Sequence, residues 1–119
     1  MEYRQLGRSG IAVSVIGIGT NQFGNPVDAP GVQTMLEAAM ESGINAIDTA
    51  DGYGGTLSED SIARAIAAMG HRHDWVVMTK FGNYPMGKAP NNSGTSRGHL
   101  RKSIVGSLQR LRTDYIDLY

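Results

Sequence analysis

Three side chains of the types that hold or move protons in enzymes stand at the ends of apolar segments. Asp48 directly follows the apolar segment 44–47, and Lys80 ends the apolar run 75–79. Tyr53 follows Asp48 after a short stretch, in a glycine-containing turn. A carboxylate, a phenol and an ammonium group can together carry out acid–base chemistry. Taken singly, each also has an ordinary interpretation, as a turn residue, a rim aromatic or a solvated charge.

The elements that would bring these side chains together alternate along the chain. Residues 3–6 and 11–13 flank a Gly-Arg-Ser-Gly turn, which predicts a β-hairpin over residues 1–14. From residue 15 onward, short apolar strands alternate with segments whose apolar residues recur at helical spacing. We expect the four strands at residues 15–19, 44–47, 75–79 and 115–119.

Three amphipathic helices are expected between these strands. Ser58 and Ser96 are expected to cap the second and third helices, while Gly43 and Gly70 end the first and second. The predicted apolar faces consist of Val32, Met35, Leu36, Ala39 and Met40 in the first helix, Ile62, Ala65, Ile66 and Met69 in the second, and Leu100, Ile104, Leu108 and Leu111 in the third.

The predicted α/β fold is a hairpin followed by βαβαβαβ, an order that implies parallel strands joined by right-handed crossovers. An open doubly wound sheet and a (β/α)8 TIM barrel both fit this order. A barrel of eight units needs ~250 residues, so a chain of 119 residues holds about half of one. Because the sequence also stops inside an apolar strand, we expect residues 1–119 to be a single incomplete domain, the N-terminal half of a barrel.

A long polar loop is expected at residues 82–98, after the third strand. Because it follows the carboxyl end of that strand, the loop would overhang the candidate site. With Phe81, Tyr84, Pro85 and Met86 it is expected to shape a substrate pocket.

The composition excludes several classes of partner and site. Eleven basic and eleven acidic residues cancel, so we expect no nucleic acid and no anionic membrane as a partner. The absence of cysteine removes disulfides, thiolate metal ligands and cysteine nucleophiles. No apolar run approaches the ~18 residues of a membrane span, and the polar start lacks a signal peptide. We therefore expect a cytoplasmic protein.

Several segments together resemble the aldo-keto reductase family, and they follow one another in the family's order over almost the whole chain. They are residues 43–54 with Ser58-Glu59, residues 79–82, residues 107–111 with 114–119, and the opening segments 3–7 and 17–20. The resemblance implies a (β/α)8 barrel that reduces aldehydes or ketones with NADPH.

In that family an aspartate, a tyrosine, a lysine and a histidine form the catalytic group, and Asp48, Tyr53 and Lys80 match the first three. Carbonyl reduction requires a hydride at carbon and a proton at oxygen. The resemblance implies that Tyr53 donates this proton. A free phenol is a reluctant acid at neutral pH, so a nearby cation must favour its ionised form, and Lys80, held by Asp48, is the expected cation.

The resemblance places the histidine three residues beyond Tyr119, outside this chain, together with most of the family's cofactor-binding strands. Gly19, Thr20, Asn21 and Asp48 remain as expected cofactor-binding residues, and we expect NADPH binding by the chain alone to be weak or absent. A half barrel would also expose apolar surface and unpaired strand edges, so self-association is expected.

Two other functions remain open beside reduction of a small carbonyl substrate. The chain could be an inactive fragment, or it could be a cofactor-sensing regulatory subunit, as some relatives of the family are. His71, His73 and Asp74 could be read as metal ligands, but they fall in a helix-to-strand turn opposite the expected active face. We therefore expect a surface turn and no metal site.

Overall fold

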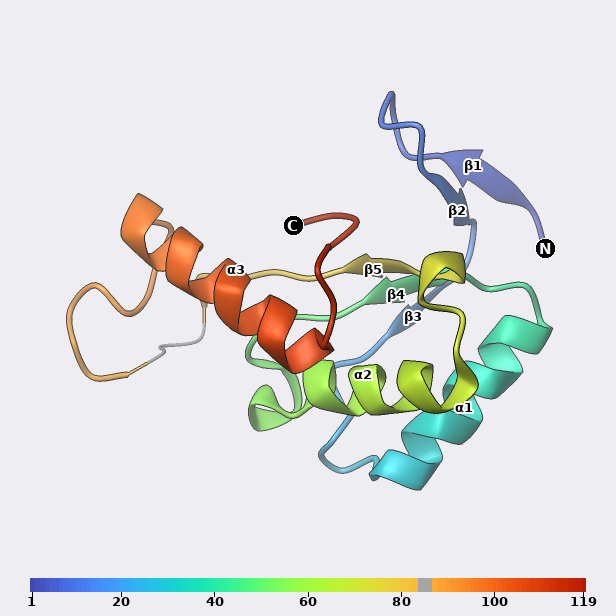
Figure 1. Ribbon diagram of the computed structural model, residues 1–119, viewed down its shortest axis with the longest axis horizontal. Coiled ribbons are helices and arrows are strands. Elements are labelled where there is room, and N and C mark those ends of the chain that lie inside the picture. The colour runs from blue at the N-terminus through green and yellow to red at the C-terminus, as the bar shows by residue number, and fades with distance from the viewer. Residues whose placement is uncertain (84–86) are drawn as a thin grey trace.

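The computed structural model describes residues 1–83 and 87–119, and its elements alternate as the sequence predicts (Figure 1). Tyr84, Pro85 and Met86, expected above the substrate pocket, lie outside the described residues. In chain order the elements are β1 (Tyr3–Gln5), β2 (Ala12–Ser14), β3 (Gly17–Gly19), α1 (Ala29–Glu41), β4 (Ala46–Asp48), the 3-10 turn η1 (Tyr53–Thr56), α2 (Ser58–Met69), the 3-10 turn η2 (Arg72–Asp74), β5 (Val76–Met78) and α3 (Arg97–Leu111).

The predicted hairpin is confirmed: β1 and β2 pair in antiparallel fashion. The hairpin is fixed to the chain just before β4. The Asn45 side chain accepts a hydrogen bond from Ser14 N at 2.8 Å and donates one to Ala12 O at 2.9 Å. Tyr3 Oη donates to Gly43 O at 2.7 Å. The hairpin therefore sits at the amino end of β4, opposite the end at which Asp48 stands.

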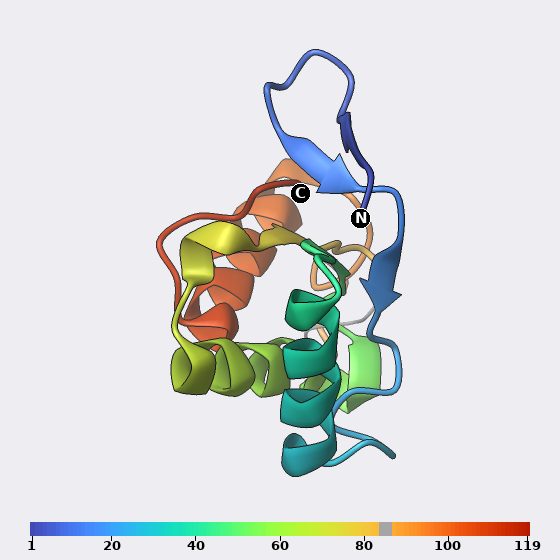
Figure 2. The same ribbon diagram turned by 90° about the vertical axis from the view of Figure 1, so that its right-hand side faces the viewer.

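β3, β4 and β5 form a parallel sheet in that order, with Ile18, Ile47 and Val77 in register. The helices α1, α2 and α3 lie together on one side of this sheet (Figures 1 and 2). A doubly wound sheet carries helices on both faces, whereas the strands of a β/α barrel carry them on the outside only. Between the two predicted architectures, the arrangement is that of the barrel.

The predicted fourth strand, residues 115–119, is present as a single parallel bridge between Met78 and Leu118. Thr79 N donates to Leu118 O at 3.0 Å, and Asp117 N donates to Val77 O at 3.1 Å. This segment therefore runs beside β5 in the predicted direction, but without the full ladder of a strand.

The core lies between the sheet and the helices. Ile47 and Val77 contribute from the sheet, and Trp75 precedes β5 with 2% of its surface exposed. The helical part of the core consists of Val32, Leu36 and Ala39 from α1, Ile62, Ala65 and Ile66 from α2, and Leu111 from α3. The predicted faces of α1 and α2 are thus confirmed, except that Met35 is 44% exposed.

The predicted face of α3 is confirmed only in part, because Leu111 is in the core and Ile104 and Leu108 are partly buried, whereas Leu100 is 38% exposed. The other buried residues of α3 are His99, Ser103 and Ser107, which the apolar spacing did not predict. α3 packs against α2, where Arg110 Nε of α3 donates to the buried carboxylate of Glu59 at 2.7 Å. Among residues 1–83 and 87–119, no helix is long and apolar enough to cross a membrane.

The helix ends follow the sequence with one exception. Gly43 and Gly70 follow α1 and α2 with positive φ angles of 77° and 76°, a conformation that favours glycine. Ser96 caps α3, since its Oγ accepts from His99 N at 3.3 Å. Ser58 does not cap α2: Leu57 occupies the cap position without a side-chain bond, and the Ser58 hydroxyl points elsewhere.

Candidate active site

Lys80 and Asp48 meet at the carboxyl ends of β5 and β4, which are neighbours in the parallel sheet. Lys80 Nζ donates to Asp48 Oδ1 at 2.7 Å and to the carbonyl oxygen of Thr49 at 2.6 Å. Both charged side chains are about half exposed, at 47% for Lys80 and 50% for Asp48. The ammonium group is therefore held by two acceptors from one short segment, yet it stays open to solvent on another side.

Tyr53 lies against the same ammonium group. Lys80 Nζ is 4.9 Å from the centroid of the Tyr53 ring, within the range of a cation–π interaction. The backbone after Tyr53 turns sharply, with left-handed φ angles of 59° at Gly54 and 68° at Gly55. Gly54 N donates to Asn21 O at 3.3 Å, which fixes this turn to the loop after β3. The structure thus brings Asp48, Tyr53 and Lys80 together.

A cavity of about 210 Å³ opens at this group of residues. Tyr53 and Lys80 line it together with Phe81, whose ring stacks on Tyr119 at a centroid distance of 5.2 Å. The remaining lining residues are Ala50, Asp51, Gly52 and Asn83. The cavity combines aromatic walls with an ammonium group, a carboxyl group and an amide, which is the character of a small-molecule site.

The residues at the carboxyl end of β3 differ in how accessible they are to a ligand. A Cβ added at Gly19 would meet no atom within 4 Å, so a ligand can approach the Gly19 backbone. Asn21 is exposed, whereas Thr20 is fully buried. Thr20 N and Thr20 Oγ1 both donate to Asp48 O, at 3.1 and 2.9 Å, and Thr20 O accepts from Phe23 N at 3.0 Å. Gly19, Asn21 and Asp48 are therefore accessible to a ligand, while Thr20 lies beneath them.

Ser58 completes a buried cluster under the site. Its Oγ lies 3.0 Å from Thr20 O, from Thr20 Oγ1 and from Thr49 Oγ1. Thr20, Thr49 and Ser58 are each 0% exposed. These bonds explain why Ser58 does not cap its own helix, because its hydroxyl is committed to residues from two other loops.

A buried ion pair lies beside Thr79, the residue that precedes Lys80. Glu59 Oε2 accepts from Arg110 Nε at 2.7 Å, and Glu59 Oε1 accepts from Thr79 Oγ1 at 2.6 Å. The Glu59 side chain is 0% exposed and that of Arg110 22% exposed. This pair links α2, α3 and the residue that precedes Lys80, so it fixes the end of β5 from the helix side.

Asp51 and Tyr119 are further buried polar groups near this ion pair. Burial, aided by the negative charge of Glu59, raises the pKa of the Asp51 carboxyl, against an opposing effect of Arg110. Burial likewise raises the pKa of Tyr119 to about 12, with the Asp51 charge acting in the same direction. Asp51 Oδ2 and Tyr119 Oη have no hydrogen-bond partner among the described residues. The folded state therefore disfavours the ionised form of each group relative to the unfolded chain.

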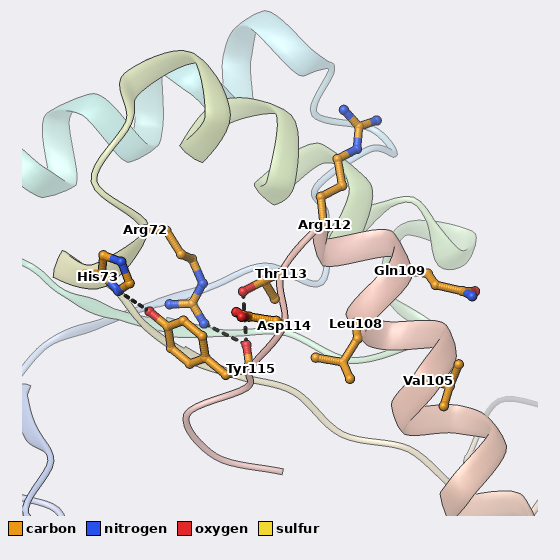
Figure 3. A pocket seen from close by; sticks show the side chains of 9 residues that line it. All are labelled: Arg72, His73, Val105, Leu108, Gln109, Arg112, Thr113, Asp114 and Tyr115. Carbon is orange, nitrogen blue, oxygen red and sulfur yellow. Dashed lines mark hydrogen bonds between the residues drawn. The ribbon is translucent and has the colours of Figure 1, made fainter.

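A larger hollow of about 620 Å³ lies away from Lys80, at the amino end of β5 (Figure 3). Arg72 donates to Tyr115 O at 3.0 Å and lies over the Tyr115 ring at 4.0 Å, and His73 Nδ1 is 3.0 Å from Tyr115 Oη. Val105 and Leu108 of α3 form its apolar side. The hollow shares no lining residue with the cavity at Tyr53, so it is separate from the candidate site.

His71, His73 and Asp74 lie in the exposed turn between α2 and β5. His71 Nδ1 is 3.1 Å from Asp74 Oδ2. Within the part of the chain that the structure describes, no group of three His, Cys, Asp or Glu side chains is arranged to hold a metal ion.

The residues that support the site from below were not predicted from the sequence. No role in the site was predicted for Thr49, Glu59 or Arg110, and Ser58 was expected to cap its helix. The sequence does contain one signal for a buried ion pair: Glu59 lies next to the apolar face of its helix. A carboxylate that is buried there requires a partner. The partner itself could not be identified, because Arg110 lies 51 residues away.

The fold and most of the sequence match one known family. A model of the Aldo/keto reductase family matches residues 15–119. The structure superposes on the holo form of an aldo-keto reductase from Bacillus halodurans with a TM-score of 0.84 and 34% sequence identity. This superposition covers 100% of this chain and 39% of that chain. The chain is therefore similar to one part of a β/α barrel enzyme.

Curated relatives include two plant proteins, each described as "Probable voltage-gated potassium channel subunit beta". The protein from Oryza sativa subsp. japonica is 38% identical and the one from Arabidopsis thaliana 35% identical. Each match covers 99% of this chain and 36% of the relative. The chain thus spans about a third of the length of these relatives.

Proposed function

Since the chain belongs to the aldo/keto reductase family, we propose that it supplies the proton-donating part of a site that reduces aldehydes or ketones to alcohols. Tyr53 is the proton donor, Lys80 the cation that supports it, and Asp48 the carboxylate that holds Lys80. The observation that carries this proposal is the position of Lys80 Nζ, 2.7 Å from Asp48 Oδ1 and 4.9 Å from the Tyr53 ring centroid.

The three side chains have different roles in the protonation of the carbonyl oxygen. As the oxygen gains negative charge, Tyr53 Oη gives up its proton to it and becomes a phenolate. The positive charge of Lys80 stabilises this phenolate. Asp48 and the Thr49 carbonyl keep the ammonium in place, so that it does not need to reorganise during the reaction. Afterwards the phenolate recovers a proton from solvent, which the half-exposed site admits.

The proposed cofactor is NADPH, which supplies the hydride for the carbonyl carbon when bound. Gly19, Asn21 and Asp48 would hold its nicotinamide end, because the Gly19 backbone is open to approach and the other two side chains are accessible. Thr20 would support this surface from below. Because the chain spans 36% of its curated relatives, turnover is proposed for a protein of their length, and NADPH binding by this chain alone is expected to be weak or absent.

A chimera tests the proposal in a complete barrel. Residues 1–119 replace the matching part of the Bacillus halodurans enzyme, which superposes over 100% of this chain. The chimera and the chain alone are assayed for NADPH oxidation with a panel of aldehydes and ketones. We expect turnover by the chimera and a loss of about 10²–10⁴-fold in kcat on Tyr53→Phe. A folded chimera that binds NADPH but reduces no carbonyl in the panel would contradict the proposal.

A second candidate, a cofactor-sensing regulatory subunit, is favoured by the names of the two plant relatives. The pairing of Lys80 with both Asp48 and Tyr53 favours the enzyme, because a binding subunit has no need of a supported proton donor. The regulatory subunit would be favoured by two results together. The protein would co-purify with a potassium channel equally well with and without Tyr53→Phe, and it would reduce no carbonyl compound. The third candidate is an inactive fragment, which turnover by the chain alone would contradict.

A further inference from the structure

Three hydroxyl groups from separate parts of the chain meet in one fully buried cluster. Thr20 follows β3, Thr49 follows β4 and Ser58 begins α2, and each is 0% exposed. Thr49 Oγ1 and Ser58 Oγ are 3.0 Å apart, and Ser58 Oγ is 3.0 Å from both Thr20 O and Thr20 Oγ1. We call these three residues the hydroxyl triad.

Each hydroxyl group has one proton, and counting these protons fixes the direction of the bonds. Thr20 Oγ1 gives its proton to Asp48 O at 2.9 Å. Ser58 Oγ gives its proton to Thr20. The proton between Thr49 and Ser58 must therefore come from Thr49. The hydroxyl triad is a one-way series that starts at Thr49 and ends at the Asp48 carbonyl.

The two ends of this series are also the two residues that hold the Lys80 ammonium group. Asp48 accepts from Lys80 through its carboxylate at 2.7 Å, and Thr49 accepts through its carbonyl oxygen at 2.6 Å. The Lys80 side chain is 47% exposed, and its other contact of note among the described residues is the Tyr53 ring, whose centroid is 4.9 Å from Nζ. The position of the ammonium therefore depends on how firmly residues 48 and 49 are fixed.

We propose that the hydroxyl triad of Thr20, Thr49 and Ser58 positions the Lys80 ammonium group by locking the backbone of Asp48 and Thr49. This role rests on the proposed function, in which Lys80 supports the proton donor Tyr53. The three are positioning residues that act through Lys80, because their full burial beneath the strand ends keeps them from a substrate. Removing one hydroxyl leaves buried polar atoms without partners and loosens the two acceptors of the ammonium.

The exchange of ammonium protons with solvent measures this restraint without any need for turnover. The chain has three lysines, Lys80, Lys88 and Lys102, so a sample labelled with ¹⁵N-lysine gives three ammonium signals. The signal of Lys80 is assigned by its absence in Lys80→Met. We expect Lys80 to exchange about tenfold more slowly than the exposed Lys88, because two acceptors hold its protons. Equal exchange rates for Lys80 and Lys88 in the unmodified chain would overturn the proposal.

Matched variants separate positioning from general support of the fold. Ser58→Ala and Thr49→Val each remove one hydroxyl and are expected to speed Lys80 exchange about tenfold. Thr49→Ser keeps the hydroxyl and should restore slow exchange. Ser61→Ala is the control, because Ser61 is also buried on α2 and its hydroxyl makes no hydrogen bond among the described residues.

Amide spectra of each variant show whether the chain stays folded. If Ser58→Ala fails to fold, the pair Thr49→Val and Thr49→Ser still decides the question, since the two variants differ in whether residue 49 keeps its hydroxyl. Exchange that is slow in Thr49→Ser and fast in Thr49→Val supports the proposal, and equal exchange in the two variants overturns it.

The two proposals can fail separately. If Lys80 exchange responds as expected but Tyr53→Phe in the chimera leaves carbonyl reduction unchanged, positioning stands and the proposed reaction fails. If Tyr53→Phe abolishes reduction while Ser58→Ala changes neither Lys80 exchange nor kcat, the reaction stands and the role of the hydroxyl triad fails.

Discussion

Glu59 on α2 and Arg110 on α3 form an ion pair in which the carboxylate is completely buried, with Arg110 Nε 2.7 Å from Glu59 Oε2. The second carboxylate oxygen accepts from Thr79, the residue before Lys80. Two helices and one strand end therefore meet at a single buried charge. The stability of this region depends on Arg110 much more than on the exposed ion pairs of the chain.

Arg110→Met should destabilise the chain by about 3 kcal/mol, because it leaves Glu59 charged and buried without its cation. Arg64→Met is the matched control, since Arg64 pairs with Asp60 at 2.6 Å but is 60% exposed. We expect that control to lose less than about 1 kcal/mol. Urea unfolding followed by circular dichroism gives both values, and equal losses for the two variants would contradict the central role of the buried pair.

Asp51→Asn should stabilise the chain at neutral pH. The pKa of Asp51 is raised in the folded state by burial and by Glu59, so its ionised form favours the unfolded chain. The contribution of this carboxyl is fully present below its unfolded pKa and is lost as pH rises through the folded pKa. The gain on substitution comes from removing a charge that the folded state disfavours, so it should appear near neutral pH and vanish in acid.

Urea unfolding at several pH values tests the Asp51 prediction. Asp114→Asn is the control, because Asp114 is exposed and its replacement should matter little at any pH. A gain for Asp51→Asn that is the same in acid and at neutral pH would show that the charge of Asp51 is not the cause.

Lys80→Met should abolish carbonyl reduction while leaving the fold almost unchanged. The Lys80–Asp48 pair is about half exposed, so its loss should cost less than about 1 kcal/mol. Lys80→Arg should not restore activity, because a planar guanidinium cannot reproduce the two short bonds of a compact ammonium to Asp48 and Thr49. Urea unfolding of both variants measures their stability, and NADPH oxidation by chimeras that carry the same substitutions measures their activity. Full activity of Lys80→Arg would contradict the prediction.

Gly54→Ala should be far more damaging than Gly55→Ala. Both glycines have left-handed φ angles, so an alanine costs about 1–2 kcal/mol of strain at either position. At Gly54 the new Cβ would also overlap the carbonyl oxygen of Phe23, whereas at Gly55 it would meet nothing within 4 Å. Gly54→Ala should therefore displace the turn that carries Tyr53. Thermal unfolding ranks the two variants, and similar melting temperatures would contradict the structure of this turn.

The chain should self-associate through β3, which is an edge strand of the sheet. Among the described residues, β3 pairs only with β4. Val15 and Ile16, just before β3, are 47% and 57% exposed. Ile16→Lys should weaken association about tenfold, because it places a charge beside an unpaired strand edge. Sedimentation velocity over a range of concentrations tests this, and a monomer at every concentration would be the contrary result.

Most elements of this fold could be predicted from the sequence because their signals are local. The faces of α1 and α2 follow from apolar residues at helical spacing, and Gly43 and Gly70 end these helices with the positive φ angles that glycine permits. The meeting of Asp48 with Lys80 was also predictable, since both follow neighbouring parallel strands.

What could not be predicted depends on partners that are distant in the chain. Ser58 looks like a cap from its neighbours alone, and only the fold reveals Thr20, 38 residues earlier, as its partner. α3 was assigned an apolar face because its leucines recur at helical spacing, yet Ser103 and Ser107 face inward. One polar partner on this side of α3 is the buried Glu59 of α2, which accepts from Arg110, 51 residues later in the chain.

The hydroxyl triad also constrains how sequences of this kind can evolve. Because each proton in the series serves the next residue, loss of the Ser58 hydroxyl removes much of the benefit that Thr49 provides, and the second loss costs less than the first. Because of this epistasis, exchange between serine and threonine within the hydroxyl triad should be tolerated singly, whereas apolar replacements should be tolerated mainly in combination. A descendant that no longer needs a restrained ammonium at Lys80 would be free to lose all three hydroxyls together.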